Sequence, residues 1–529
     1  MEDTNDEKVT PEQDARQQAQ VVQLIEFVTS NPAISLFHDE YGEGYVRLPL
    51  GTHCEVWPCS SSGFKRWLSK SFYESTGKVP NQNVLSGALQ VISAKAEFDN
   101  DELHLGTRVV QRRGRILYDL TDKEWRAVRV LPTGWNIEAD VPPYFRRYAY
   151  QAAQVEPVLG GDIRDALKFV NIKRPDHQLL FLVGLCAYFV PGSPRPIFYF
   201  HGPQGSAKTT ASKILRKLID PSRVEVLTLP RNIEELKQAL AHYYFLSFDN
   251  VGYIPADVSD LLCQAVTGSG FSKRKLYTDD EDIIRTVRAN LSINSITIGS
   301  TRADFLERSV LIELERVSKQ DRRQEHEIMD EFEKARPALL GAVFTALSKA
   351  LSIQPTVQTA NLPRMADFTI WGAALAEAIG YTQKEFLDAY WQNIDTQNDE
   401  VLSDNPTASL VLALMNDRKE WSGTAAALLK ELHDLSLTLL IADKELPRSP
   451  SALSRELSRL ESSLGEEGLF FSRSGGATRT LTISHLPANA APAVTPSRIE
   501  DWLPENDAND ANDGDYGDSY TGKEVLPGE

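Results

Sequence analysis

The chain has 529 residues, of which 42% are hydrophobic and 25% charged, and its net charge is −18. This length suggests roughly three or four domains of about 100–200 residues, and the hydrophobic fraction excludes a wholly disordered chain. The acidity at first disfavours a nucleic-acid partner, because phosphate binding needs clustered Lys and Arg. However, residues 1–20 carry −4 and residues 495–529 carry −8, which leaves −6 for the 474 residues between them. Most of the acidity therefore lies in the tails.

The cellular compartment is indicated by what the sequence lacks. Four cysteines do not make a disulfide framework in a chain of this size and fit a reducing compartment. The longest apolar run, residues 179–190, is shorter than the ~20 residues that span a bilayer. The acidic N-terminus does not resemble a secretory signal. We expect a soluble, cytoplasmic protein without a membrane partner.

The N-terminal quarter has a mixed pattern. Residues 1–20 are acidic and read as a disordered tail, and residues 21–156 read as a small α+β domain with its own core. The helices expected in this domain are 21–29, 64–74 and 84–96. The expected strands are 44–49, 54–58, 108–111, 114–118 and 125–130.

Residues 157–352 alternate buried strands with helices, after a helical stretch at 160–192. The expected strands are 197–200, 224–227, 244–248, 287–294 and 309–314, and the expected helices are 207–218, 233–242, 258–267 and 325–352. Unbroken apolar strands that alternate with helices indicate a mostly parallel sheet covered on both faces. Residues 353–405, with a helical pattern at 364–392, read as a connector, and residues 487–529 as a second disordered acidic tail.

The strongest motif is a glycine-containing loop between an apolar strand and a helix. It comprises Gly202, Pro203, Gln204, Gly205, Ser206, Ala207, Lys208, Thr209 and Thr210. Such a loop turns its N–H groups onto phosphate oxygens, and the helix N-terminus adds its positive dipole end. We expect Lys208 to bind the β- and γ-phosphates of ATP and Thr209 to bind Mg²⁺. Ala207 stands where the pattern GxxxxGK[ST] has its second glycine, and it restricts positive φ.

Polar residues at the ends of later strands complete a phosphate site. Asp249 ends an apolar strand and is the expected Mg²⁺ partner. Asn250 follows where many related enzymes have Glu, and since Asn cannot accept a proton, the general base stays open. Asn294 ends another strand and could sense the γ-phosphate, or be an ordinary turn residue. Arg308 could stabilise charge at a neighbouring subunit's nucleotide, or form a surface ion pair with Glu307 or Asp304.

This ordered set resembles the superfamily 3 helicases of the AAA+ class, particularly the primase-helicase-like ATPases of phages, plasmids and integrated elements. The resemblance covers roughly residues 160–350. It implies that an insertion after the acidic strand forms a hairpin facing DNA in a ring's channel. Here that hairpin would present Lys273, Arg274, Lys275 and Tyr277. Four acidic residues at 279–282 follow them, and a solvated charged hairpin is the alternative.

Residues 406–486 have the layout of a winged helix. Helices are expected at 408–415, 424–435 and 450–464, with 420–421 as a short connector and a hairpin at 468–483. Ser449 or Ser451 can cap the third helix. The residues expected to bind DNA are Arg455 and Arg459 on that helix and Arg473 and Arg479 on the wing. Winged helices also mediate protein contacts, and nearby Glu residues dilute the basic signal.

The predicted fold class is therefore an α/β P-loop NTPase, AAA+-like, with an N-terminal α+β domain and a C-terminal winged helix. The predicted function is an ATP-dependent DNA helicase or translocase in the replication of a mobile element. It would hydrolyse ATP with Mg²⁺ at subunit interfaces of a homo-oligomeric ring, a hexamer. Single-stranded DNA would occupy the channel and duplex DNA the winged helix. One alternative is an ATP-switched DNA-binding protein without unwinding activity, and another is an ATPase that remodels protein partners.

Overall fold

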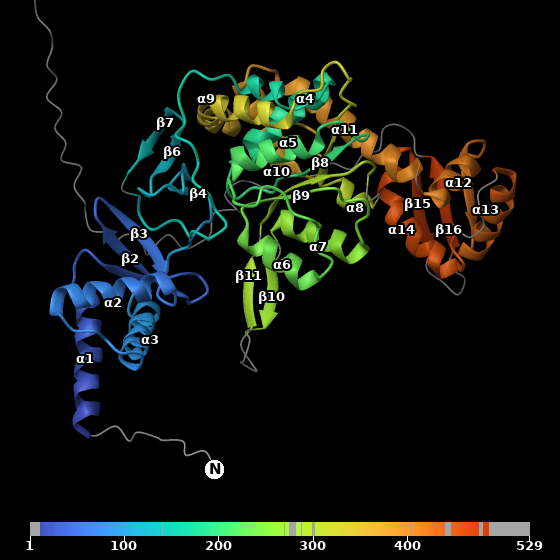
Figure 1. Cartoon of the computed structure of the whole chain (residues 1–529). Helices are drawn as coiled ribbons and strands as arrows, with labels where there is room; N and C mark the ends of the chain where they lie inside the picture. The colour runs from blue at the N-terminus through green and yellow to red at the C-terminus, as the bar shows by residue number, and fades with distance from the viewer. Residues whose placement is uncertain are drawn as a thin grey trace, which may run out of the picture. The chain divides into compact units, whose positions relative to one another are not determined.

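The computed structural model describes residues 11–139, 141–268, 270–274, 282–286, 288–298, 302–403, 405–439, 446–474 and 480–485 (Figure 1). Residues 1–10 and 486–529, which include most of the two predicted acidic tails, lie outside the described residues.

The first body of the chain packs three helices against a small antiparallel sheet. The helices are α1 (Pro11–Thr29), α2 (Ser62–Thr76) and α3 (Gln82–Phe98), and the sheet has the order β1 (Ser35–His38), β2 (Gly44–Leu50), β3 (His53–Pro58). The side chains of Ser61 and Asn81 cap α2 and α3. Because α1 begins at Pro11, residues 11–20 are helical, and the prediction of a disordered tail up to residue 20 was wrong there.

The predicted N-terminal domain does not have one core of its own. Its second half is an antiparallel meander of β4 (Val109–Arg112), β5 (Arg115–Asp119), β6 (Ala127–Leu131) and β7 (Gly134–Glu138). This meander packs on α9 (Glu325–Ile353), where Trp135 Nε1 donates to Thr345 Oγ1 at 3.0 Å and the rings of Tyr118 and Phe344 lie 5.4 Å apart. The meander therefore shares its core with the centre of the chain.

The centre of the chain is a four-stranded parallel sheet, as predicted. Its order is β13 (Ser309–Glu313), β8 (Ile197–His201), β12 (Asn290–Asn294), β9 (Phe245–Phe248). Alternate residues of β8 enter two cores, Phe198 and Phe200 on one face and Ile197 and Tyr199 on the other, as the two-residue period of a strand requires. The sheet is thus buried on both faces.

Helices cover the two faces of this sheet. Figure 1 shows α4 (Pro175–Ala187), α5 (Lys208–Ile219) and α9 on one side and α6 (Ile233–His242) and α7 (Ala256–Thr267) on the other. The predicted helix 160–192 is a 3₁₀ helix at Ile163–Lys168 followed by α4. The strand predicted at 224–227 is absent from the described residues there, where Leu227 makes only an isolated bridge to Phe248.

The predicted connector at 353–405 is part of the central core. Its helices α10 (Ala366–Ala378) and α11 (Gln383–Ser403) pack against each other through the rings of Phe368, Phe386 and Tyr390. Both helices also pack against α4, and α10 packs against α9. Asn393 on α11 bonds both backbone groups of Leu311, at 3.0 and 2.7 Å, and so satisfies the edge strand β13. Helix α9 is long and apolar enough to cross a membrane, but 56% of its apolar window is buried in the protein, which accounts for that composition.

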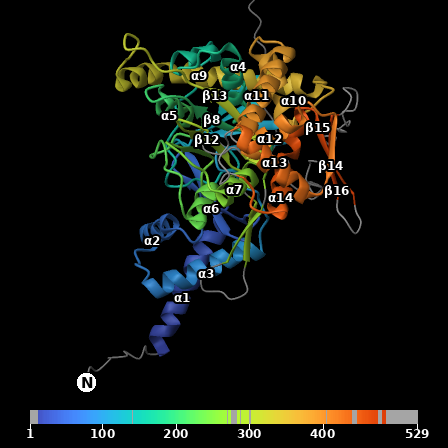
Figure 2. The ribbon, with the colours of Figure 1, turned by 90° about the vertical axis from the view of Figure 1, so that its right-hand side faces the viewer.

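The C-terminal part follows the predicted order of elements with one addition. It contains α12 (Pro406–Met415), α13 (Ala425–Leu439) and α14 (Pro450–Glu466), with a sheet of order β14 (Glu420–Gly423), β16 (Thr480–His485), β15 (Leu469–Ser474) (Figure 2). The expected connector at Glu420 and Trp421 is the strand β14, which pairs with β16. Ser449 caps α14 by accepting from Ala452 N at 3.2 Å.

Candidate functional site

The loop of residues 202–207 joins β8 to α5, and its backbone conformation depends on small residues. Gly202 has φ +142°, and a side chain there would place its Cβ 2.1 Å from the carbonyl oxygen of Leu314. Gly205 has φ +77° and Ala207 has φ +66° with ψ +28°. Ala207 therefore adopts the left-handed conformation of the glycine it replaces, at a cost of roughly 1–2 kcal/mol for an L-residue. The second glycine is not required for this loop shape.

Lys208 folds back over the loop. Its Nζ donates to the carbonyl oxygens of Gly202 at 2.7 Å and Pro203 at 2.9 Å and to Ser206 Oγ at 3.1 Å. Burial lowers the pKa of Lys208, and the carboxylate of Asp249 raises it in part. The first amides of α5 have no acceptor within their own helix, and the helix dipole adds positive potential at the same point. The loop thus concentrates donors and positive charge.

Thr209 and Asp249 meet at the end of the sheet. Thr209 Oγ1 donates to Asp249 Oδ1 at 3.0 Å, although the two residues are 40 positions apart. Asp249 follows β9, and its N–H donates to the carbonyl of Leu227 at 2.9 Å. A hydroxyl and a carboxylate oxygen are ligands that Mg²⁺ accepts when phosphate and water complete its shell. The donor set therefore fits the predicted metal.

Asn294 lies buried behind this pair and connects three elements. Its Oδ1 accepts from Asn250 N at 2.8 Å, and its Nδ2 donates to Ser212 Oγ on α5 at 3.1 Å. Asn294 is 1% exposed, whereas Asn250 is exposed and has φ +54°. Through these two bonds Asn294, at the end of β12, is connected to the residue after β9 and to α5. Of the two asparagines, Asn250 is the one that faces solvent. Ser212 is a partner that the sequence did not indicate.

Arg308 forms the ion pair that the sequence left open as an alternative. Its Nη1 donates to Asp304 Oδ1 at 2.5 Å and to Asp304 O at 2.8 Å. Arg364 also contacts Asp304, at 2.7 Å, and Glu307, at 2.6 Å. Arg308 lies between α8 (Ala303–Leu306) and the start of β13, at the opposite end of the parallel strands from the loop that carries Lys208. Within one chain the structure does not bring Arg308 to the loop.

The predicted DNA-contacting residues lie in two further places. Lys273 and Arg274 belong to β10 (Gly270–Arg274), which pairs with β11 (Asp282–Thr286) in the expected hairpin. Lys275, Tyr277 and Arg479 lie outside the described residues, as do the side chains of Lys273 and Arg274. Arg455 and Arg459 are exposed on α14, opposite its buried leucines. Arg473 is paired with Glu461 at 3.0 Å, which offsets its charge.

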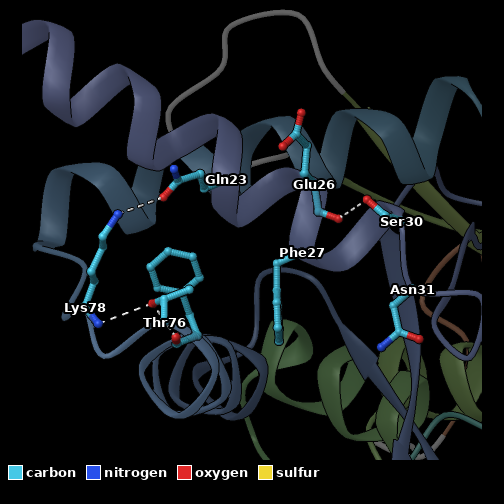
Figure 3. Close-up of a pocket in the computed structure, with 8 residues that line it drawn as sticks. Gln23, Glu26, Phe27, Ser30, Asn31, Thr76 and Lys78 are labelled. Carbon is cyan, nitrogen blue, oxygen red and sulfur yellow. Dashed lines mark hydrogen bonds between the residues drawn. The ribbon is translucent and has the colours of Figure 1, made fainter.

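A shallow pocket lies apart from these residues, in the first body of the chain. Figure 3 shows it between α1 and α2, lined by Gln23, Glu26, Phe27, Ser30, Asn31, Phe72, Thr76 and Lys78. Lys78 Nζ donates to Gln23 Oε1 at 3.5 Å across it. Its lining has no cluster of titratable groups suited to catalysis. Among the described residues no three His, Cys, Asp or Glu side chains form a metal site either.

Comparisons with known proteins bear on most of the chain. Residues 163–400 match the family model described as actinomycete integrative conjugative element replication protein, and residues 407–497 match its RepA C-terminal domain. The two models thus meet at the junction between α11 and α12. No curated protein matches the chain.

Solved structures match only distantly. The A-form apo structure of the NrS-1 C-terminal region, residues 305–718, is 11% identical with a TM-score of 0.40, and the match covers 88% of this chain and 99% of that one. A second apo structure of that region is 11% identical with a TM-score of 0.38 and the same coverage. The two family matches identify the chain as a replication protein of a mobile element, of the integrative conjugative element type.

Proposed function

We propose that the loop of residues 202–209 binds ATP with Mg²⁺ and that the chain hydrolyses it during replication of the element. The contact between Thr209 and Asp249 carries this proposal, because it joins a loop hydroxyl to a strand-end carboxylate beside Lys208. Lys208 would exchange its loop carbonyls for phosphate oxygens, and Thr209 and Asp249 would hold the metal. The metal would neutralise charge on the phosphates.

We propose that ATP hydrolysis drives movement of the protein along DNA, as in superfamily 3 helicases. The β10–β11 hairpin would contact single-stranded DNA inside a homo-oligomeric ring, a hexamer. The C-terminal part would act as a winged helix whose α14 presents Arg455 and Arg459 to duplex DNA, since both are exposed. Arg308 would act on the nucleotide of a neighbouring subunit once it leaves Asp304. Asn250 would position the attacking water, and Asn294 would hold Asn250 in place.

The test compares ATP hydrolysis by the full chain with and without single-stranded DNA. We expect stimulation by DNA and loss of hydrolysis in Lys208→Ala. The matched control is Lys217→Ala, which changes a lysine of the same helix that pairs with Glu333 at 2.9 Å. Hydrolysis that survives in Lys208→Ala would refute the site. Sharing of Arg308 between subunits predicts that mixing Arg308→Ala with Lys208→Ala protein restores activity, and no restoration would refute it.

A second candidate is an ATP-switched DNA-binding protein that does not unwind. Two departures from the usual phosphate-site pattern favour it: Ala207 stands at the second glycine, and Asn250 cannot accept a proton from water. The lack of a general base at Asn250 would slow hydrolysis without preventing binding. A strand-displacement assay separates the candidates. Unwinding with ATP supports the helicase, and ATP-dependent assembly on DNA without unwinding supports the switch.

A further inference from the structure

The segment that follows β13, residues 314–324, runs along the outside of the phosphate loop. Leu314 N donates to His201 O at 2.8 Å, and Val317 N donates to Gly205 O at 3.1 Å. The carbonyl of Leu314 fills the space that a side chain at Gly202 would need. His201, Gly202 and Gly205 therefore all contact this segment, which is not part of any sequence motif.

The second half of the segment is fixed by a turn at residues 318–321 and by the N-terminus of α9. Ser318 Oγ donates to Asp321 Oδ2 at 2.7 Å, and Asp321 N donates to Ser318 O at 3.2 Å. Helix α9 begins at Glu325, whose carboxylate accepts from Lys213 Nζ of α5 at 2.6 Å. The residues between these two anchors, including Arg322, are thus kept beside the loop, and the carboxylate of Asp321 is already engaged by Ser318.

Arg322 is a cation that lies beside the phosphate loop. A Cβ at Gly205 would lie 3.8 Å from Arg322 Nη2, so the guanidinium is next to the loop backbone. Arg322 is exposed and forms no ion pair with any residue in the described part of the chain. Its neighbour Arg323 is different, because Nη2 of Arg323 is bonded to Glu331 at 2.5 Å.

The order of the strands assigns Arg322 to one end of a bound nucleotide. Asp249 and Asn294 follow β9 and β12, on one side of β8, and residues 314–324 follow β13, on the other side. A nucleotide with its metal at Thr209 and Asp249 therefore directs its terminal phosphate away from Arg322. On the basis of the proposed function, we propose that Arg322 binds the non-terminal phosphates of a nucleoside di- or triphosphate through its guanidinium. An arginine fork suits phosphate oxygens, and charge-assisted hydrogen bonds are the stronger ones.

The experiment is calorimetric titration of the full chain with ATP and with ADP, each in the presence of Mg²⁺. Arg322→Ala is expected to raise the Kd of both nucleotides about tenfold, as loss of a hydrogen bond to a charged group does. Arg323→Ala, the matched control, is expected to leave both Kd values unchanged. Arg322→Lys keeps the charge and is expected to recover part of the affinity.

The outcomes separate this proposal from the function on which it rests. If the wild-type chain binds neither ATP nor ADP, the proposed function is refuted. If the wild-type chain binds both and Arg322→Ala matches Arg323→Ala, the Arg322 contact is refuted and the nucleotide site stands. A loss restricted to ATP would also overturn the contact, because it would place Arg322 at the terminal phosphate.

Discussion

Replacement of Gly202 by Ala tests whether the loop shape seen in the structure is the shape that binds nucleotide. The new Cβ would lie 2.1 Å from the carbonyl oxygen of Leu314, which is backbone and cannot rotate away, and φ +142° is a region that L-residues rarely adopt. Strained backbone of this kind costs of order 1–3 kcal/mol, and the contact adds to it. A total of about 3 kcal/mol in the binding-competent loop corresponds to roughly 100-fold weaker ATP binding.

The neighbouring glycine supplies the control. At Gly205 the nearest atom to a new Cβ is Arg322 Nη2 at 3.8 Å, so only the left-handed φ of +77° is unfavourable. That costs roughly 1–2 kcal/mol, or about tenfold in affinity. Calorimetric titration with ATP, on proteins shown by circular dichroism to be folded, should rank Gly202→Ala far below Gly205→Ala. Equal losses, or wild-type affinity in Gly202→Ala, would refute the reasoning.

Three other predictions concern stability and DNA. Gly184→Ala, whose Cβ would lie 2.1 Å from the Phe198 ring, should lower the free energy of unfolding, measured by urea denaturation, by about 1–3 kcal/mol. Gly465→Ala, with open space around the new Cβ, should raise it by roughly 0.5 kcal/mol. Burial lowers the pKa of His177 from 6.5 to about 4, so the unfolded chain binds the extra proton first and the free energy of unfolding falls as pH drops from about 6.5 towards 4. His177→Asn should reduce the slope of unfolding free energy against pH in this range by up to about 1.4 kcal/mol per pH unit. Arg459→Ala should weaken duplex DNA binding and lower its salt slope by about 1, and an unchanged slope would exclude a phosphate contact.

The parts of the fold that could be predicted are those set by local sequence patterns. The strand, loop and helix around Lys208 follow from a continuous apolar run, small residues and good helix formers, and the structure has all three. Asp249 could be placed near Thr209 because parallel strands end at the same edge of a sheet. The parallel sheet was predicted because unbroken apolar strands alternate with helices along the chain.

The parts that could not be predicted depend on contacts between distant residues. The meander β4–β7 reads as part of an independent domain until Trp135 is seen to bond Thr345, 210 positions away. Arg308 carries no sequence signal that says whether Asp304 or another subunit holds it. No motif marks the segment 314–324 in the sequence, and its bonds to His201 and Gly205 show that it lies against the phosphate loop.

Residues 202–209 and Asp249 are proposed to form a Mg²⁺-dependent ATP site. The most direct test of this site is the Kd of ATP for the wild-type chain and for Asp249→Asn, each with and without Mg²⁺. We expect Mg²⁺ to tighten ATP binding to the wild-type chain and this gain to be lost in Asp249→Asn, because the amide is a poor substitute for the carboxylate as a metal partner. An equal gain from Mg²⁺ in both proteins, or no ATP binding by the wild-type chain, would contradict it.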